Sequence, residues 1–103
     1  MNTKYLTVVA LVKAQPGREQ KVREELLSLV APSRKDEGCV SYELHQGAED
    51  RARFYFHENW TSKELLDRHL QMPHVQSVLG RVGQMVAEPP QIMLWEKISP
   101  DPV

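Results

Sequence analysis

The sequence predicts an α+β fold in which strands and helical units follow one another in the order β-α-β-β-α-β. Two observations lead to this prediction. The spacing of apolar residues changes twice along the chain from the alternation typical of strands to the three-and-four-residue spacing of an amphipathic helix. Glycine and proline mark the boundaries between these segments. This element order is that of the ferredoxin-like fold.

The first two predicted elements are a strand and a helix. Tyr5 to Lys13 is a β-branched and apolar run, and Pro16-Gly17 marks the turn after it. From Arg18 to Glu37, apolar residues recur at helical spacing among charged ones, so one face of this helix should be buried. Because Pro32 removes a backbone donor, we expect a bend or an early end near residues 28 to 32.

Two strands joined by a short loop follow. Cys39 to Gln46 and Arg53 to Trp60 both alternate, and Gly47 to Asp50 is typical of a hairpin loop. The two strands should therefore pair antiparallel.

The second helical unit is predicted in two pieces. Thr61 and Glu64 match the reciprocal capping pattern at the start of a helix, and the apolar face of that helix carries His69. Pro73 interrupts it, and a second helical pattern of apolar residues runs from Val75 to Val86.

The last predicted strand is Gln91 to Ile98, which Pro89-Pro90 forces the chain to enter in an extended conformation. With 103 residues, the chain should form a single domain, residues 1–103, with a core from about 5 to 98 and a short tail from 99 to 103.

Composition and charge exclude several classes of protein. The formal net charge of -1, with both signs interspersed, gives no basic field for nucleic acid. No apolar run approaches the roughly 20 residues that cross a bilayer, and we see no secretory signal. The single cysteine, Cys39, cannot form an internal disulfide. We therefore expect a cytoplasmic protein with no membrane or nucleic-acid partner.

Large apolar residues occur on both faces of the predicted strands. In the third strand Phe54 and Phe56 oppose Tyr55, and in the fourth Leu94 opposes Trp95. The helices can cover only one face of the sheet, so the other face needs a partner. Pairing of two sheets about a two-fold axis is the simplest closed solution, and we predict a homodimer through the sheet faces.

Several motifs together resemble those of the antibiotic biosynthesis monooxygenase domain, including its quinol monooxygenase-like members. They are Gly38-Cys-Val-Ser-Tyr-Glu-Leu44, Phe56-His-Glu-Asn-Trp60, His69 and His74, with Pro16-Gly17 before the first helix. The likeness spans about residues 5 to 98. It implies a dimeric α+β barrel of two face-to-face sheets, with a pocket in each subunit between its helices and its own sheet.

The resemblance also implies an activity. Similar members oxidise phenols, hydroquinones or related electron-rich aromatics with molecular oxygen, without flavin, haem or metal. Others isomerise small phosphorylated signals or have no assigned activity. The sequence therefore predicts a cofactor-independent monooxygenase for a small phenolic or hydroquinone-type aromatic. The alternatives are a non-catalytic small-ligand-binding or stress-associated dimer, and an isomerase of a small signalling metabolite on the same fold.

Oxygenation without a cofactor needs a dry pocket, a base that takes the substrate proton, and donors that hold the resulting anion. His69 is the candidate base because imidazole titrates near neutral pH, and Glu58 or another acceptor could fix its tautomer. Tyr42 could hydrogen-bond a substrate oxygen. His69, Glu58 and Tyr42 are therefore the predicted catalytic residues.

The predicted substrate-binding residues are Trp60 and Phe56, as flat walls for an aromatic ring, and His74 as a polar group at the pocket mouth. Each candidate has a structural alternative. A histidine on an apolar helix face is more often a hydrogen-bonded structural residue, and a buried Glu58 needs a partner whether or not it is catalytic. Cys39 is expected to be a small buried thiol and not a nucleophile.

Neither a metal nor a haem is predicted. His69 and His74 are five residues apart with Pro73 between them, which is not a ligand spacing on one helix face. Haem-degrading relatives of the fold place Asn, Trp and His at positions that hold Ala10, His69 and Leu79 here. RNA-recognition modules share the element order, but their Gly-containing, basic-flanked aromatic motif is missing.

Overall fold

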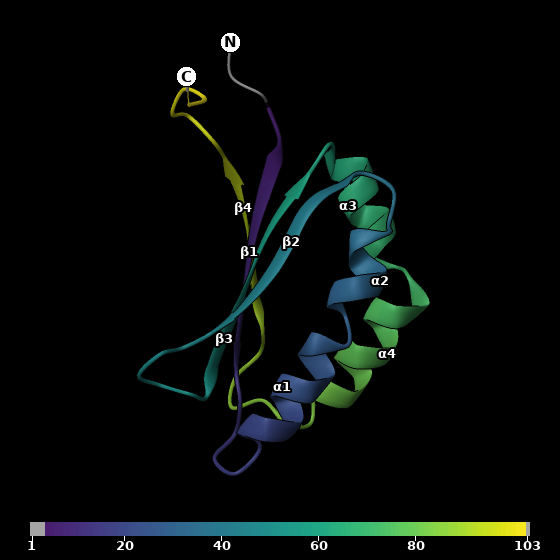
Figure 1. Ribbon diagram of the computed structural model, residues 1–103. Coiled ribbons are helices and arrows are strands. Elements are labelled where there is room, and N and C mark those ends of the chain that lie inside the picture. The colour runs from purple at the N-terminus through teal and green to yellow at the C-terminus, as the bar shows by residue number, and fades with distance from the viewer. Residues whose placement is uncertain (1–3, 103) are drawn as a thin grey trace.

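The structure is a computed structural model that describes residues 4–102, and it contains a four-stranded antiparallel sheet with helices on one face (Figure 1). The strands are β1 (Leu6–Lys13), β2 (Cys39–Gln46), β3 (Arg53–Trp60) and β4 (Gln91–Glu96), and the helices are α1 (Glu19–Leu27), α2 (Val30–Arg34), α3 (Lys63–Leu70) and α4 (Pro73–Val82). The strand order is β2-β3-β1-β4, with every neighbouring pair antiparallel. The predicted α+β, ferredoxin-like fold is confirmed.

The helix predicted from Arg18 to Glu37 consists of two shorter helices, α1 and α2. The break at residues 28 and 29 agrees with the predicted bend. Pro32 lies in the first turn of α2, where a backbone donor has no partner within the helix. The second helix ends at Arg34, three residues earlier than predicted, and the chain then turns through Gly38 at φ +86° into β2.

The predicted cap of the next helix is wrong by one residue. Ser62, not Thr61, is the N-cap of α3, because its side chain accepts a hydrogen bond from the Leu65 amide at 3.2 Å. The amide of Thr61 bonds to the Gly38 carbonyl, which holds Thr61 at the end of β3. Glu64 is thereby placed facing Arg68, with which it forms an ion pair at 3.3 Å.

Three other predicted boundaries also shift. The first strand begins at Leu6 instead of Tyr5, and β4 ends two residues before Ile98, which is 87% exposed. The last helix ends at Val82, so Val86 is not helical as predicted. Val86 instead forms a β-bridge with Ala14, because the chain after the helix pairs its backbone with the end of β1.

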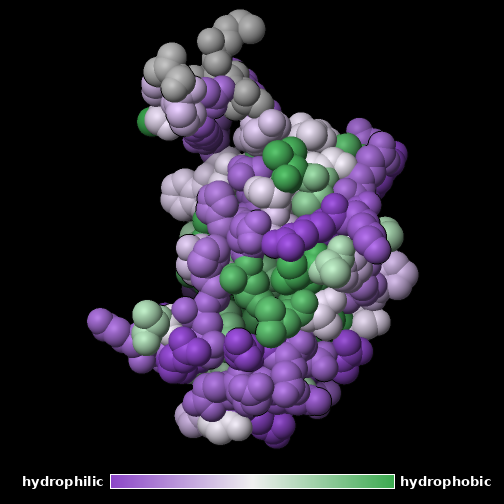
Figure 2. Space-filling view, in the orientation of Figure 1, coloured by the Kyte–Doolittle hydropathy of each residue, from purple (hydrophilic) through white to green (hydrophobic). Residues whose placement is uncertain are grey.

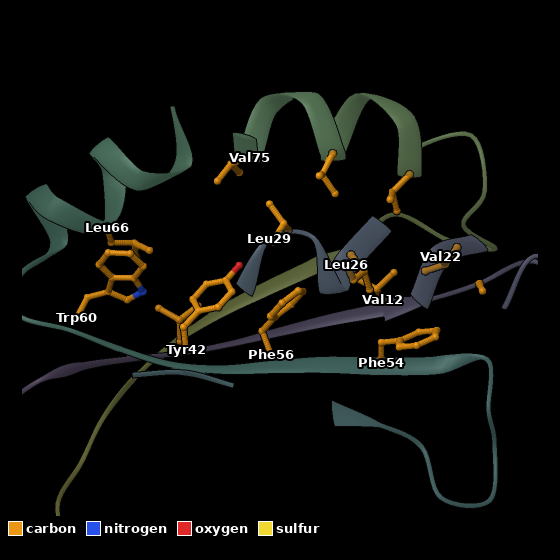
Figure 3. Close-up of a cluster of buried hydrophobic side chains, with 14 residues drawn as sticks. Val12, Val22, Leu26, Leu29, Tyr42, Phe54, Phe56, Trp60, Leu66 and Val75 are labelled. Carbon is orange, nitrogen blue, oxygen red and sulfur yellow. The ribbon is translucent and has the colours of Figure 1, made fainter. Parts of the chain in front are cut away.

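The core lies between the sheet and the helical layer. Along β3, alternate side chains are buried and exposed, so that Phe54, Phe56, Glu58 and Trp60 all face the helices. Figure 3 shows the aromatic side chains of β2 and β3 rising from the sheet toward α2, α3 and α4. Trp60 is fully buried, beneath Leu66 of α3. The strand alternation therefore decides which polar side chains enter the core.

The other face of the sheet carries no helix in the described part of the chain (Figure 1). Its exposed apolar side chains include Leu11, Tyr55 and Trp95, of which Trp95 is 55% exposed. We call this surface the open face. The space-filling view, in the orientation of Figure 1, shows apolar residues gathered near the middle of the visible surface and bordered by polar ones (Figure 2). Within residues 4–102, every helix is too short or too polar to span a bilayer.

Candidate active site

Strand β3 supplies a buried acid and an indole to the helix-facing side of the sheet. Glu58 and Trp60 are two residues apart and therefore share a face, and the indole Nε1 donates to Glu58 Oε1 at 2.8 Å. Only 5% of Glu58 is exposed. Burial raises the pKa of Glu58 to about 7, although the indole hydrogen bond acts in the opposite direction. This carboxyl group can therefore exchange a proton near neutral pH.

The last turn of α3 places His69 against Asp36, which lies in the turn between α2 and β2. The two side chains meet at 2.8 Å, between Nδ1 of His69 and Oδ2 of Asp36. Because a carboxylate can only accept, we assign the ring proton to Nδ1, which leaves Nε2 as the proton acceptor of the imidazole. Burial lowers the pKa of His69 and Asp36 opposes this, so the ring is a neutral base.

His74 approaches the same carboxylate from the first turn of α4. Its Nε2 lies 2.9 Å from Asp36 Oδ2, and its ring centroid is 5.9 Å from that of His69. The contact is close, but its geometry is not that of a hydrogen bond, and the buried Nε2 atom has no other hydrogen-bond partner. One carboxylate oxygen thus faces two imidazole nitrogens.

Aromatic rings surround the imidazole of His69. The Trp60 ring lies against it, with centroids 4.5 Å apart, and Tyr42 meets it edge-on at 5.5 Å. Tyr42 also packs on Phe56 and pairs in register with Glu58. Burial, followed by the nearby Glu58 charge, raises the pKa of Tyr42, so its hydroxyl stays protonated as a donor. Figure 3 shows this hydroxyl pointing from the sheet toward the helices.

The structure gathers the predicted site residues into one buried cluster, which we call the His69 cluster. Its members are Asp36, Tyr42, Phe56, Glu58, Trp60, His69 and His74. All six residues predicted from the sequence are among them. The acceptor that orients His69 is Asp36 and not Glu58, whose partner is Trp60. Sequence reasoning missed Asp36, because an aspartate just after a helix is usually a solvated turn residue.

The single cysteine and the remaining two histidines are not members of the His69 cluster. Cys39 is half-buried, and burial followed by the Glu58 and Asp36 charges raises its pKa to about 11. It therefore stays a thiol at neutral pH, unlike a reactive cysteine. His45 and His57 are exposed on the open face, where His45 stacks on Tyr55 with ring centroids 4.5 Å apart.

The imidazole of His69 is only 3% exposed, and the clefts described for this structure lie elsewhere on its surface. Three clefts of about 720, 610 and 220 Å³ lie on the outside of α3, at the hairpin end of the sheet, and beside α1 and β2, respectively. Neither Glu58 nor His69 lines any of them. Among Asp36, His69 and His74, the side chain of His74 is the most accessible, with 21% exposed. A ligand therefore needs side chains to move before it can reach Nε2 of His69.

The cluster also contains a set of potential metal ligands. One ligand atom each from Asp36, His69 and His74 lies within 4.8 Å of the other two. The sequence prediction of no metal site relied on ligand spacing along one helix. The two histidines lie on different helices, because the chain breaks between α3 and α4 at Pro73. This break brings the His74 ring back to within 5.9 Å of the His69 ring.

Comparison with known proteins places these features in a family. Residues 5–80 match the family described as antibiotic biosynthesis monooxygenase. A protein of Mycobacterium tuberculosis named "Putative monooxygenase Rv0793" is 29% identical over 87 residues, which is 84% of this chain and 85% of that protein. A protein of Synechocystis, sll1783, is 24% identical over 91 residues, or 88% of this chain, and the chain spans 62% of that protein's length.

Solved structures share the fold over nearly the whole chain. The crystal structure of PA3566 from Pseudomonas aeruginosa gives a TM-score of 0.88 at 30% identity, covering 96% of this chain and 99% of that one. The structure of Rv0793 gives a TM-score of 0.86 at 25% identity, covering 94% and 97%.

Proposed function

The chain belongs to the antibiotic biosynthesis monooxygenase family, and from this we propose that it is a cofactor-independent monooxygenase acting on a small phenolic or hydroquinone-type aromatic with molecular oxygen. The observation that supports the proposal most is the setting of His69. Its imidazole is buried, bonded through Nδ1 to Asp36 and enclosed by Trp60 and Tyr42. A neutral imidazole in apolar surroundings is the base that this chemistry requires.

The reaction needs no external electron donor. A hydroquinone and O2 give a hydroxyquinone and water, and the aromatic substrate supplies all four electrons. Nε2 of His69 takes the phenolic proton, the anion reduces O2, and a carbon–oxygen bond forms to give a ring peroxide that takes the proton back. Loss of the ring hydrogen as a proton then breaks the oxygen–oxygen bond, and the departing hydroxide leaves as water.

We assign the remaining residues of the cluster by their chemistry. Glu58, with a pKa of about 7, can donate a proton to the departing oxygen. The Tyr42 hydroxyl can donate to a substrate oxygen as charge develops there. Trp60 and Phe56 would form the walls that hold the aromatic ring.

Substrate entry is proposed at His74. It is the partly exposed member of the cluster, and it lies next to the break between α3 and α4. Movement at this break would uncover His69 without disturbing the sheet. Closure after entry would exclude water from the reaction.

We also propose a homodimer formed through the open face, in a cytoplasmic location. The exposed Leu11, Tyr55 and Trp95 side chains support the dimer, because large apolar side chains on a sheet face without helices usually mark an interface. Sedimentation of the Trp95→Lys variant should then give a monomer. The Leu27→Lys variant changes a similarly exposed side chain on α1 and should stay dimeric.

An oxygen-electrode screen of aromatic diols, with a metal chelator present, tests the reaction and its independence from metals together. His69→Ala should lower turnover at least about tenfold, in line with the loss of a general base. Asp67→Ala is the matched control, because Asp67 lies on the same helix, α3, with an exposed side chain outside the His69 cluster. Equal turnover of the two variants would remove His69 from the mechanism.

A non-catalytic ligand-binding dimer is the second candidate. The observation that favours it is the cleft of about 610 Å³ at the hairpin end of the sheet, which is lined by aromatic side chains such as Phe54 and Tyr55 and by none of the proposed catalytic residues. Saturable binding of an aromatic ligand without oxygen consumption would support this function over the first.

A further inference from the structure

We propose that Asp36, His69 and His74 form a binding site for a divalent transition-metal ion such as Zn²⁺, and that a bound ion switches the protein off. The metal site stands on its own geometry. The switch rests on the function proposed above, because it concerns the same imidazole.

The ligand atoms are already close to the arrangement that an ion requires. Oδ2 of Asp36 lies 2.8 Å from Nδ1 of His69 and 2.9 Å from Nε2 of His74, and all three atoms lie within 4.8 Å of one another. Nitrogen and oxygen ligands bind Zn²⁺ at about 2.0 to 2.2 Å, so adjacent ligands of one ion are roughly 3 Å apart. Only small side-chain movements are needed to admit the ion.

One buried nitrogen of the cluster has no hydrogen-bond partner among the described residues. Nε2 of His74 is buried, has no hydrogen bond and faces a carboxylate oxygen at 2.9 Å. Buried polar atoms of native proteins are nearly always paired, and an ion is one of the partners that explains an apparent exception. A cation between these atoms would satisfy the nitrogen and the carboxylate at once.

The ligand types select the class of ion. Two imidazoles and one carboxylate suit Zn²⁺, Ni²⁺, Cu²⁺ or Fe²⁺, whereas Mg²⁺ and Ca²⁺ prefer oxygen ligands. Burial of the His69 ring against Trp60 holds the first ligand in place. Asp36 contributes the negative charge that partly offsets the ion.

Metal binding and base catalysis are mutually exclusive at His69. Without metal, Nδ1 carries the proton that is donated to Asp36, and Nε2 has the free lone pair. An ion on Nδ1 forces the proton of the neutral ring onto Nε2. The proton acceptor of the proposed oxygenase then disappears without any change in the fold.

Calorimetric titration of the chelator-treated, intact protein with Zn²⁺ tests the site. We expect one ion per chain, no response to Mg²⁺, and at least about tenfold weaker binding of Zn²⁺ to His74→Gln, because even the loss of a residue that only orients a ligand weakens binding about 10- to 100-fold. Asp67→Asn should bind as the wild type does, because the Asp67 carboxylate is exposed on α3 and lies outside the ligand set. Equal affinities of His74→Gln and the wild type would overturn the site.

A measurement on the wild type avoids any effect of substitution on folding. In the NMR spectrum of the imidazole nitrogens, Zn²⁺ should shift Nδ1 of His69 and Nε2 of His74 and leave His45 and His57 unchanged. Shifts confined to His45 and His57 would show that Zn²⁺ binds outside the His69 cluster and would also overturn the site.

The switch has a separate readout. Oxygen consumption by the wild type should fall along the same Zn²⁺ concentration curve as binding, and a chelator should restore it. If Zn²⁺ binds the cluster but turnover does not change, the switch is wrong and the site stands. If the metal-free protein oxidises none of the aromatics, the proposed function fails while the titration still decides the site.

Discussion

The two carboxylates of the His69 cluster differ in origin and in partners. Glu58 comes from a strand, and its bonded partner is the neutral indole of Trp60. Asp36 comes from a turn, and its Oδ2 faces two imidazole nitrogens, at 2.8 Å and 2.9 Å. A carboxylate without a cation is pushed toward its neutral form by burial, whereas one beside imidazoles orients them. The comparison assigns proton storage to Glu58 and positioning of the base to Asp36.

The largest expected effect comes from replacing each acid by its amide. Asp36→Asn should lower kcat about 100-fold with hydroquinone substrates, because the amide no longer fixes the proton of His69 on Nδ1. Glu58→Gln should lower kcat about tenfold, since only a proton donor is lost. Steady-state oxygen consumption measures both, and KM should stay within about twofold for Asp36→Asn, as expected of a residue that does not bind substrate.

Which of the two substitutions causes the larger loss of kcat tests the roles assigned to Asp36 and Glu58. If Glu58→Gln is the more damaging substitution, the roles assigned to the two acids are reversed. If Asp36→Asn raises KM and leaves kcat unchanged, Asp36 acts on substrate binding and not on the orientation of His69.

The next effect concerns stability and pH. The pKa of Glu58 is about 7 in the folded chain and 4.5 in the reference state, so the folded protein binds more protons between these values. Its stabilising contribution is complete below pH 4.5 and is lost as pH rises through 7. Between pH 5 and 8, the free energy of unfolding should fall by about 2 to 3 kcal/mol from this group alone.

Urea unfolding of Glu58→Gln across the same pH range isolates that contribution. The variant should show a flatter profile than the wild type by about the same 2 to 3 kcal/mol. Glu96→Gln, at the exposed end of β4, should keep the wild-type profile. A wild-type profile in Glu58→Gln would mean that another group causes the pH dependence.

The same contrast explains how much of the site could be predicted. Strand alternation is local, so Phe56, Glu58 and Trp60 could be placed on one buried face from the sequence alone. The contact of Asp36 with His69 spans 33 residues and depends on how the chain turns after α2. The spacing of His69 and His74 did not indicate a shared ligand set for a related reason. The spacing rule assumes one continuous helix, and Pro73 starts a second one. The His69 cluster therefore follows from tertiary packing at turns.

The order of the elements was predictable because each has its own periodicity, but their ends were less so. Thr61 and Ser62 are both good capping residues, and only the pairing of the Thr61 amide with Gly38 decides between them. Val86 continues a helical pattern in sequence, yet it forms a β-bridge with Ala14, the residue that follows β1. Competing partners that are distant in sequence decide each of these cases.

The smallest expected effect concerns the turn that carries Asp36. Gly38 has φ +86°, and an added Cβ would lie 2.6 Å from the side chain of Leu65 at the start of α3. Gly38→Ala should lower the free energy of unfolding by about 2 kcal/mol, because the left-handed backbone is unfavourable for alanine and the contact pushes α3 away from the turn. Urea unfolding measures this loss.

Gly80→Ala provides the matched control, because Gly80 is exposed in the last turn of α4 and an added Cβ meets no atom within 4 Å. It should raise the free energy of unfolding by about 0.5 to 1 kcal/mol, the helix preference of alanine over glycine. Because α3 carries His69, Gly38→Ala should also lower kcat, whereas Gly80→Ala should not. Loss of stability in Gly38→Ala with full kcat would show that the turn supports the fold without positioning Asp36 against His69.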